Sequence, residues 1–177
     1  HAIGDFGAAV ELSKKDSYAV GIADSYRGLG YVYWRMGEYE TLQEASNTLT
    51  VLVAGTTLSF FQVPDPFLFP PTPYRCFFLA DLRDIALMKL AAITNRGSRK
   101  DFIDLYFILA EGPELEDLLG LMANKFGAGR FNLYQVLMSL AYFDDAEAEP
   151  MPPMLVPFDW EQCKGFLLRE CRAVVLP

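Results

Sequence analysis

The sequence predicts an α+β fold, with a small antiparallel sheet, a dominant C-terminal helical part and further helices at the N-terminus. Two short segments, residues 48–53 and 57–61, are rich in β-branched and aromatic residues, as strands are. Apolar residues recur at helical spacing before residue 45 and after Asp81. Of the 177 residues, 52% are apolar, which is enough to fill a core.

Residues 1–45 are predicted to be mainly helical and to form a first domain. Within them, Leu29-Gly30, Tyr33 and Gly37-Glu38-Tyr39 stand at spacings that resemble the first helix and turn of a tetratricopeptide repeat. The resemblance covers about one and a half repeats, fewer than the three or so that stack stably. A helical repeat-like segment packed on another part of the protein is therefore expected here.

Residues 46–177 form the second predicted domain, which opens with the sheet. Residues 48–53 and 57–61 should pair as an antiparallel hairpin around the Ala-Gly-Thr turn between them. Residues 63–74 hold five prolines and are predicted to be an irregular loop. Residues 76–79 can add a short third strand.

Capping patterns mark the helices that follow. Asp81 begins one helix, Ser98 and Asp101 form a capping-box pattern at the next, and Asp159 begins the last. The acidic, proline-containing stretch of residues 144–157 is predicted to be a surface strap. The cysteines Cys163 and Cys171 share an apolar helical stripe, so core thiols are the expected role.

A lysine interrupts the apolar stripe of the first of these helices. The stripe consists of Leu82, Ile85, Ala86, Lys89 and Ile93. A lysine in that place must extend to water, pair with a carboxylate or lose its proton. Asp101 and Asp104 on the next helix share a face, and a short turn should bring them near Lys89. We predict an amine–carboxylate distance below about 4 Å to at least one of them.

The turn between these two helices is basic in an otherwise acidic chain. Arg96, Arg99 and Lys100 cluster there, beside Ser98, whereas the whole chain carries a net charge of −8. The three cations either form a solvated turn or contact an anion such as a triphosphate or RNA. Lys89 likewise has two interpretations, a structural ion pair that fixes two helices or a phosphate contact.

Composition excludes several classes of protein. The negative charge argues against non-specific binding of nucleic acid by the whole surface. Apolar runs are shorter than the roughly 18–20 residues of a membrane span, and the sequence has no signal-peptide pattern, so a cytoplasmic protein is expected. The three cysteines are too scattered for a zinc site, and the only histidine is His1, which argues against a Ser-His or Cys-His pair.

From about residue 42 onwards the chain resembles the nucleotidyltransferase-like AbiEii/AbiGii toxin family. The matching motifs occur in the expected order, at residues 47–53, 58–61, 79–86, 88–93, 96–106, 142–147 and 150–155. The most specific of them are Met88-Lys89-Leu-Ala-Ala-Ile and Arg96-Gly-Ser-Arg-Lys-Asp101-Phe-Ile-Asp104-Leu-Tyr106.

This resemblance implies a minimal nucleotidyltransferase fold and transfer of a nucleoside monophosphate from a nucleoside triphosphate to an RNA or protein acceptor. It also implies a link to toxin–antitoxin and phage-defence operons, with a cognate antitoxin or another protein as partner. The implied catalytic residues are Lys89, Asp101 and Asp104. The implied substrate-binding residues are Arg96, Ser98, Arg99 and Lys100.

The chain departs from the family pattern at the metal site. The family's Asp-x-Asp strand, whose carboxylates hold two metal ions, is absent from this sequence, so no metal ligands are assigned. Magnesium is expected only if the missing carboxylates are supplied upstream or by a partner. Whether the chain is an enzyme stays open, and the alternative is a non-catalytic binding module with a degenerate nucleotidyltransferase fold.

Overall fold

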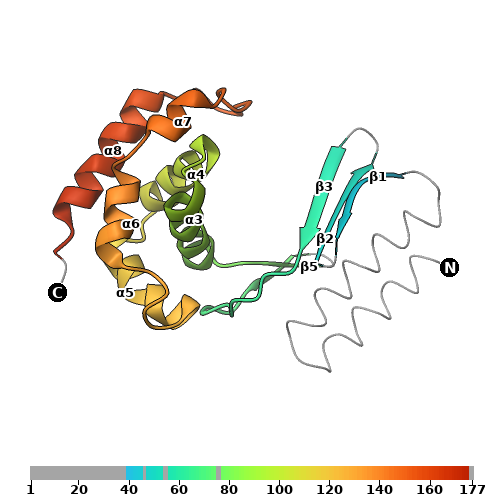
Figure 1. Ribbon diagram of the computed structural model, residues 1–177, viewed down its shortest axis with the longest axis horizontal. Coiled ribbons are helices and arrows are strands. Elements are labelled where there is room, and N and C mark those ends of the chain that lie inside the picture. The colour runs from blue at the N-terminus through green and yellow to red at the C-terminus, as the bar shows by residue number, and fades with distance from the viewer. Residues whose placement is uncertain (1–38, 46, 54–55, 75–76, 176–177) are drawn as a thin grey trace. The chain divides into compact units, whose positions relative to one another are not determined.

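The computed structural model describes residues 39–45, 47–53, 56–74 and 77–175 (Figure 1). The chain divides into two compact units, one of residues 1–64 and 73–78 and the other of residues 65–72 and 79–177. Each unit is described by itself. The predicted helices and repeat-like pattern of residues 1–38 lie outside the described residues.

The first unit contains an antiparallel sheet with the strand order β1-β2-β3 (Figure 1). Its strands are β1 (Tyr39–Ala45), β2 (Thr48–Val53) and β3 (Thr56–Phe61). The pairing of β2 with β3 runs from Thr48 opposite Phe61 to Val53 opposite Thr56. The hairpin predicted from the β-branched pattern is thus confirmed.

Strand β1 corrects the prediction of helix for residues 39–45, the end of the segment expected to be mainly helical. Residues 39–45 pair antiparallel with β2, with an irregularity in register between Thr41 and Gln43. The segment has no clean period, since Leu42 stands between Glu40 and Glu44 and residues 40–45 are all exposed, so its sequence suits a strand as well as a helix. Because an isolated hairpin is only marginally stable, a third strand adds hydrogen bonds that override the weak local preference for helix.

A second, two-stranded sheet joins β4 (Thr72–Tyr74) to β5 (Phe77–Leu79). The prediction of an irregular loop is therefore wrong for its last three residues. The short strand expected at residues 76–79 does form, but it pairs with β4 and not with the β2–β3 hairpin.

The second unit is helical, which confirms the α+β class with a dominant C-terminal helical part. Its helices are α3 (Leu82–Arg96), α4 (Arg99–Ala110), α5 (Leu115–Phe126), α6 (Leu133–Leu140), α7 (Asp144–Ala148) and α8 (Trp160–Ala173). The predicted caps Asp81 and Asp159 each accept a backbone N–H of the first helical turn. The predicted strap of residues 144–157 instead begins with the short helix α7.

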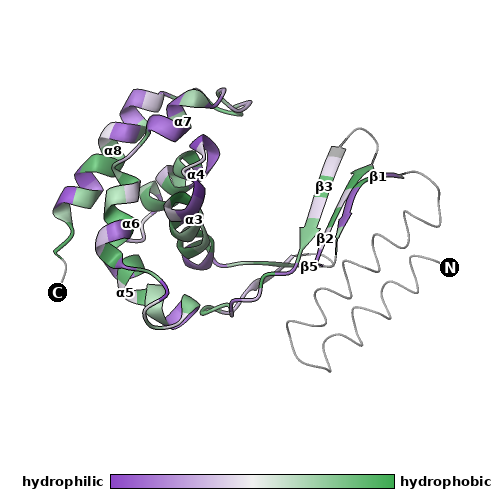
Figure 2. Cartoon of the chain, in the orientation of Figure 1, coloured by the Kyte–Doolittle hydropathy of each residue, from purple (hydrophilic) through white to green (hydrophobic). Residues whose placement is uncertain are grey.

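The helical core is built around the α3–α4 hairpin. Helix α3 packs on α5 and α6, whereas α4 packs on α7 and α8, and the apolar sides of these helices face one another (Figure 2). Phe102 lies fully buried at the centre, with ring centroids 5.1 Å from Phe143 and 6.2 Å from Trp160. Cys163 is fully buried and Cys171 packs on the same core, so the prediction of core thiols is confirmed.

The buried face of α3 differs from the predicted stripe. The buried residues are Asp84, Ala86, Leu87, Leu90 and Ile93. Leu82 is 49% exposed, and Lys89 is only partly covered. The apolar spacing of α3 fits two adjacent faces almost equally well, and contact with α5 and α6 selects the one that contains Asp84.

Within the residues that the structure describes, no helix is both long and apolar enough to span a bilayer.

Candidate functional site

Lys89 lies between the two predicted aspartates of α4. Its Nζ is 2.9 Å from Asp101 Oδ1 and 2.6 Å from Asp104 Oδ2. The prediction of an amine–carboxylate distance below about 4 Å is confirmed for both. The reason is local: Gly97 ends α3 with a φ of 57°, in the left-handed region, so a short turn returns α4 along α3.

Asp101 is the buried centre of this group, which we call the Lys89 cluster (Lys89, Arg96, Asp101 and Asp104). Its side chain is fully buried and uses both oxygens, one for Lys89 and the other for Arg96, at 2.9 Å from Nε and 2.7 Å from Nη2. Asp104, by contrast, is 50% exposed. The cluster therefore has a saturated interior carboxylate and an outer face made by the Lys89 ammonium and Asp104.

The carboxylates keep Lys89 charged. Burial on its own lowers the pKa of a lysine, but the hydrogen bonds to Asp104 and Asp101 outweigh it and raise the pKa of Lys89 above its usual value. Near neutral pH the side chain is an ammonium. It can donate to an anion but cannot act as a general base.

Ser98 and Arg99, which the sequence predicts as ligand contacts, are instead held inside the protein. Ser98 Oγ donates to Glu149 Oε2 at 2.9 Å, and the backbone N–H of Arg99 donates to the same oxygen at 2.8 Å. The Arg99 guanidinium donates to the Ala146 carbonyl at 2.7 Å and lies 5.0 Å from the Trp160 ring centroid. Ser98 fastens α4 to Glu149, just after α7, and the Arg99 side chain fastens α4 to α7 itself, so neither side chain faces a ligand.

The same contacts correct the predicted capping box. Ser98 occupies the N-cap position without a side-chain cap bond, and Asp101 turns towards Lys89 and Arg96. Glu149, about fifty residues later in the chain, accepts the α4 N-terminal N–H instead. A carboxylate at a helix N-terminus is favoured by the orphan N–H groups and the helix dipole.

We expect Glu149→Ala to lower the free energy of unfolding by about 1–2 kcal/mol, because it removes a charged cap and leaves the Ser98 hydroxyl unpaired. Urea denaturation measures the change. Glu161→Ala removes an exposed partner of Lys164 and should change stability by less than about 0.5 kcal/mol. Equal effects of the two substitutions would contradict the capping role of Glu149.

The remaining basic residues of the turn are exposed. Arg96 keeps a side-chain exposure of 58% although it binds Asp101. Lys100 is exposed on α4, and the described residues give it no ion pair. Of the four substrate contacts implied by the sequence, Arg96 and Lys100 are thus accessible, whereas Ser98 and Arg99 are not.

The Lys89 cluster does not fit a metal ion. The place between its two carboxylates is taken by the Lys89 ammonium, and Asp101 has no oxygen left to donate. Across the described residues, no group of three or more Asp, Glu, His or Cys side chains is arranged to hold a metal. Of the described thiols, burial raises the pKa of Cys163 to about 12 and that of Cys171 to about 11, so both remain protonated near neutral pH.

A second, fully buried ion pair was not predicted from the sequence. Asp84 Oδ1 is 2.7 Å from Lys125 Nζ, and both side chains have 0% exposure. Asp84 also accepts the backbone N–H groups of Leu68 and Phe69, each at 3.0 Å, while Lys125 donates to the Pro66 carbonyl at 3.0 Å. This network ties the proline-rich segment to α3 and α5, and it leaves no access for a ligand.

Comparisons with known proteins give one relative of unstated function. The uncharacterized protein aq_aa25 of Aquifex aeolicus (strain VF5) is 33% identical over 141 residues, which is 78% of this chain. The match spans 66% of that relative's length, just under two thirds. No family model matches the chain, and no solved structure matches it. The resemblance to the AbiEii/AbiGii family therefore stays a prediction.

Proposed function

We propose that this chain is part of a nucleotidyltransferase-like toxin-family protein of the cytoplasm. It would transfer a nucleoside monophosphate from a nucleoside triphosphate to an RNA or protein acceptor. The metal-holding carboxylates would come from another segment of a longer protein or from a partner such as an antitoxin. The Lys89 cluster would be this chain's share of the active site.

The observation that supports this proposal is the difference between the two lysine–aspartate pairs attached to α3. The Lys125–Asp84 pair is wholly buried and surrounded by further hydrogen bonds, as a purely structural pair should be. The Lys89 side chain is 23% exposed, and its partner Asp104 is half exposed. A structural fastening has no need of this open face, whereas a phosphate contact does.

The chemistry assigns a separate part to each member of the cluster. In the reaction, an acceptor oxygen bonds to the α-phosphorus, the bond to the β-phosphate oxygen breaks, and pyrophosphate leaves. Lys89 would donate to a phosphate oxygen, and Asp104 would accept the proton of the attacking hydroxyl. Asp101, whose oxygens are both occupied, would hold Lys89 and Arg96 in place. Arg96 and Lys100 would contact the triphosphate or RNA.

Lys89→Met should weaken binding of ATP and of a single-stranded RNA oligonucleotide at least about tenfold, since one charge-assisted hydrogen bond is worth about 1.5–3 kcal/mol. Stability should fall by only about 1–2 kcal/mol, because Asp101 Oδ1 loses its Lys89 donor, whereas Arg96 still pairs with Asp101 and Asp104 can turn to water. Isothermal titration with each ligand and a urea melt of the same variant measure both quantities.

Arg83→Met is the matched control. It removes one positive charge from the same helix, at an exposed pair with Asp81, and it should leave binding within about twofold of the wild type. Equal loss of binding in both variants would show that only net charge matters. A large loss of stability in Lys89→Met without loss of binding would assign Lys89 a structural role.

The alternative is a non-catalytic binding module. It is favoured by one observation, that the carboxylates of the Lys89 cluster are occupied by cations of the protein itself. We expect the chain alone to transfer no label from nucleoside triphosphates to bulk tRNA in magnesium or manganese. Incorporation above that of Lys89→Ala would contradict this expectation. Activity that appears only when an Asp-x-Asp segment is supplied would support the enzyme.

A further inference from the structure

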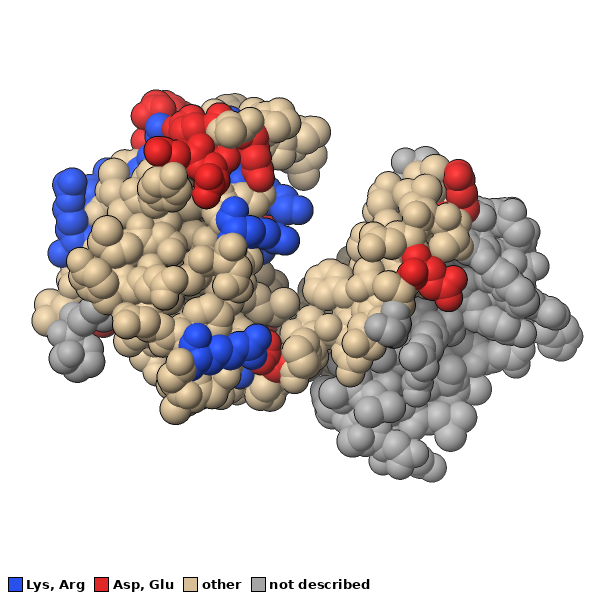
Figure 3. Space-filling model, viewed as in Figure 1, with Lys and Arg blue, Asp and Glu red and all other residues tan. Residues whose placement is uncertain are grey.

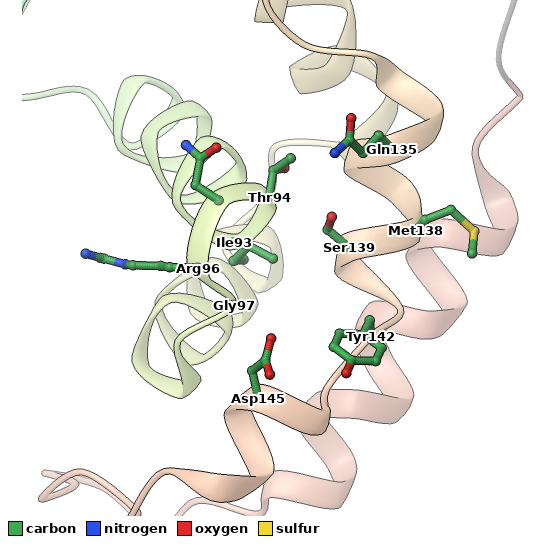
Figure 4. Close-up of a pocket in the computed structure, with 10 residues that line it drawn as sticks. Ile93, Thr94, Arg96, Gly97, Gln135, Met138, Ser139, Tyr142 and Asp145 are labelled. Carbon is green, nitrogen blue, oxygen red and sulfur yellow. The ribbon is translucent and has the colours of Figure 1, made fainter.

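A pocket of about 340 Å³ lies between the C-terminal end of α3 and the α6–α7 region (Figure 4). Lys89, Asp101 and Asp104 are not among the residues that line it. Most of its exposed wall is apolar, but the residues that line it include several with hydrogen-bonding side chains, namely Thr94, Asn95, Gln135, Ser139, Tyr142 and Asp145. This volume is near the lower end of the range found for ligand-binding pockets in proteins.

The charge that faces this pocket is negative. Arg96 contributes to the wall, but its guanidinium is bound to Asp101 and extends away from α6 (Figure 4). Asp145 points towards Gly97, where its Oδ2 would be 3.7 Å from a Cβ atom at that glycine. Residues 93–97, at the C-terminal and therefore negative end of the α3 dipole, line the same pocket.

Acidic residues next to the pocket make its electrostatic potential more negative. Asp and Glu side chains gather over α7 (Figure 3). Within that helix Glu147 is paired with Lys164 and Arg99, whereas Asp144 and Asp145 have no ion pair among the described residues. The Asp144 and Asp145 carboxylates raise the pKa of Tyr142 above its usual value, because they make the electrostatic potential at its phenol more negative. An anionic ligand would be repelled here, and a cationic one would be attracted.

Exposed apolar side chains extend the surface beyond the pocket. Tyr134, Met138 and Tyr142 are 66%, 55% and 52% exposed and follow one another at intervals of four residues. That interval places Tyr134 and Met138 on one face of α6, with Tyr142 just past its end. A row of this length exceeds what a small cation would cover, and tyrosine and methionine are enriched at interfaces between proteins.

We propose that this pocket binds an arginine side chain of a partner polypeptide. The guanidinium pairs with Asp145 and stacks on Tyr142, and neighbouring residues of the partner cover Met138 and Tyr134. Arginine fits better than lysine because its planar fork matches a carboxylate and its face stacks on an aromatic ring. This inference does not depend on the nucleotidyltransferase proposal.

The test uses the full chain and two synthetic probes. One is a six-residue peptide with a central arginine between leucines, and the other is the same peptide with citrulline, which keeps the shape without the charge. Fluorescence anisotropy should show that the arginine peptide binds at least about tenfold more tightly. Asp145→Asn should reduce its affinity by a similar factor. Asp117→Asn, which removes an equal charge from α5, should leave the affinity within about twofold.

A matched pair of variants at Gln135 provides an independent readout, because this exposed residue lines the pocket from α6. Gln135→Glu should tighten binding of the arginine peptide, and Gln135→Lys should weaken it. Equal affinity for both peptides would overturn the proposal, and so would equal effects of Asp145→Asn and Asp117→Asn. Loss of peptide binding in Lys89→Met but not in Asp145→Asn, or binding of an RNA oligonucleotide that Asp145→Asn abolishes, would also overturn it.

Discussion

Lys125→Met is expected to lower the free energy of unfolding by about 3–5 kcal/mol, the cost of leaving one partner of a buried ion pair uncompensated. Asp84 would remain fully buried with only the N–H groups of Leu68 and Phe69 as hydrogen-bond donors. Methionine is about as long as lysine, so the loss of unfolding free energy would come from the missing charge and not from a cavity. Urea denaturation is the suitable measurement, because urea does not screen ion pairs.

The double variant Asp84→Leu with Lys125→Met should recover only part of this loss. It removes the buried charge, but it also leaves the backbone N–H groups of Leu68 and Phe69 without their acceptor. Arg130→Met, which breaks an exposed pair with Asp65, is the control and should cost less than about 1 kcal/mol. A Lys125→Met variant as stable as Arg130→Met would refute the structural role of the buried pair.

Asp101→Asn is expected to give the second largest effect, about 2–3 kcal/mol of lost stability by urea denaturation. Asparagine keeps the shape but removes the charge that two cations share. The loss should be smaller than for Lys125→Met, because Lys89 and Arg96 are 23% and 58% exposed and can turn to water.

Asp104→Asn tests the same cluster from its exposed side. Its carboxylate is half exposed, so the change in stability should stay below about 1 kcal/mol. Under the proposed function, however, this variant should lose more activity in a completed enzyme than its stability explains. If Asp104→Asn destabilised the protein as much as Asp101→Asn, the division into a buried and an exposed carboxylate would be wrong.

Local sequence patterns were sufficient to predict the contacts that form across a single turn of the chain. The Lys89–Asp101 and Lys89–Asp104 contacts join residues twelve and fifteen positions apart, across a turn whose direction Gly97 dictates. The β2–β3 hairpin likewise depends on two adjacent segments and the turn between them. In both cases a single turn determines which side chains meet.

Contacts between distant segments were not predictable in this way. Asp84 and Lys125 are 41 residues apart, and Glu149 lies 50 residues from Arg99. Neither Asp84 nor Glu149 belongs to a local sequence pattern from which its partner could be predicted. Ser98 and Asp101 show the converse problem, because their spacing is that of a capping box although tertiary contacts direct both side chains elsewhere.

The buried network around Asp84 determines where the helical unit can be separated from the rest of the chain. Residues 65–72 and 79–177 belong to this unit, whereas the intervening residues 73–78 belong to the other unit. A truncated protein that started at Leu79 would carry Asp84 and Lys125 without the N–H and carbonyl groups of residues 66–69. Proteolytic nicking within residues 73–78, by contrast, would leave residues 66–69 held to the helices by these hydrogen bonds and by the packing of Leu68 on the core. Dissection of this protein into independent folding units therefore requires a start before Asp65.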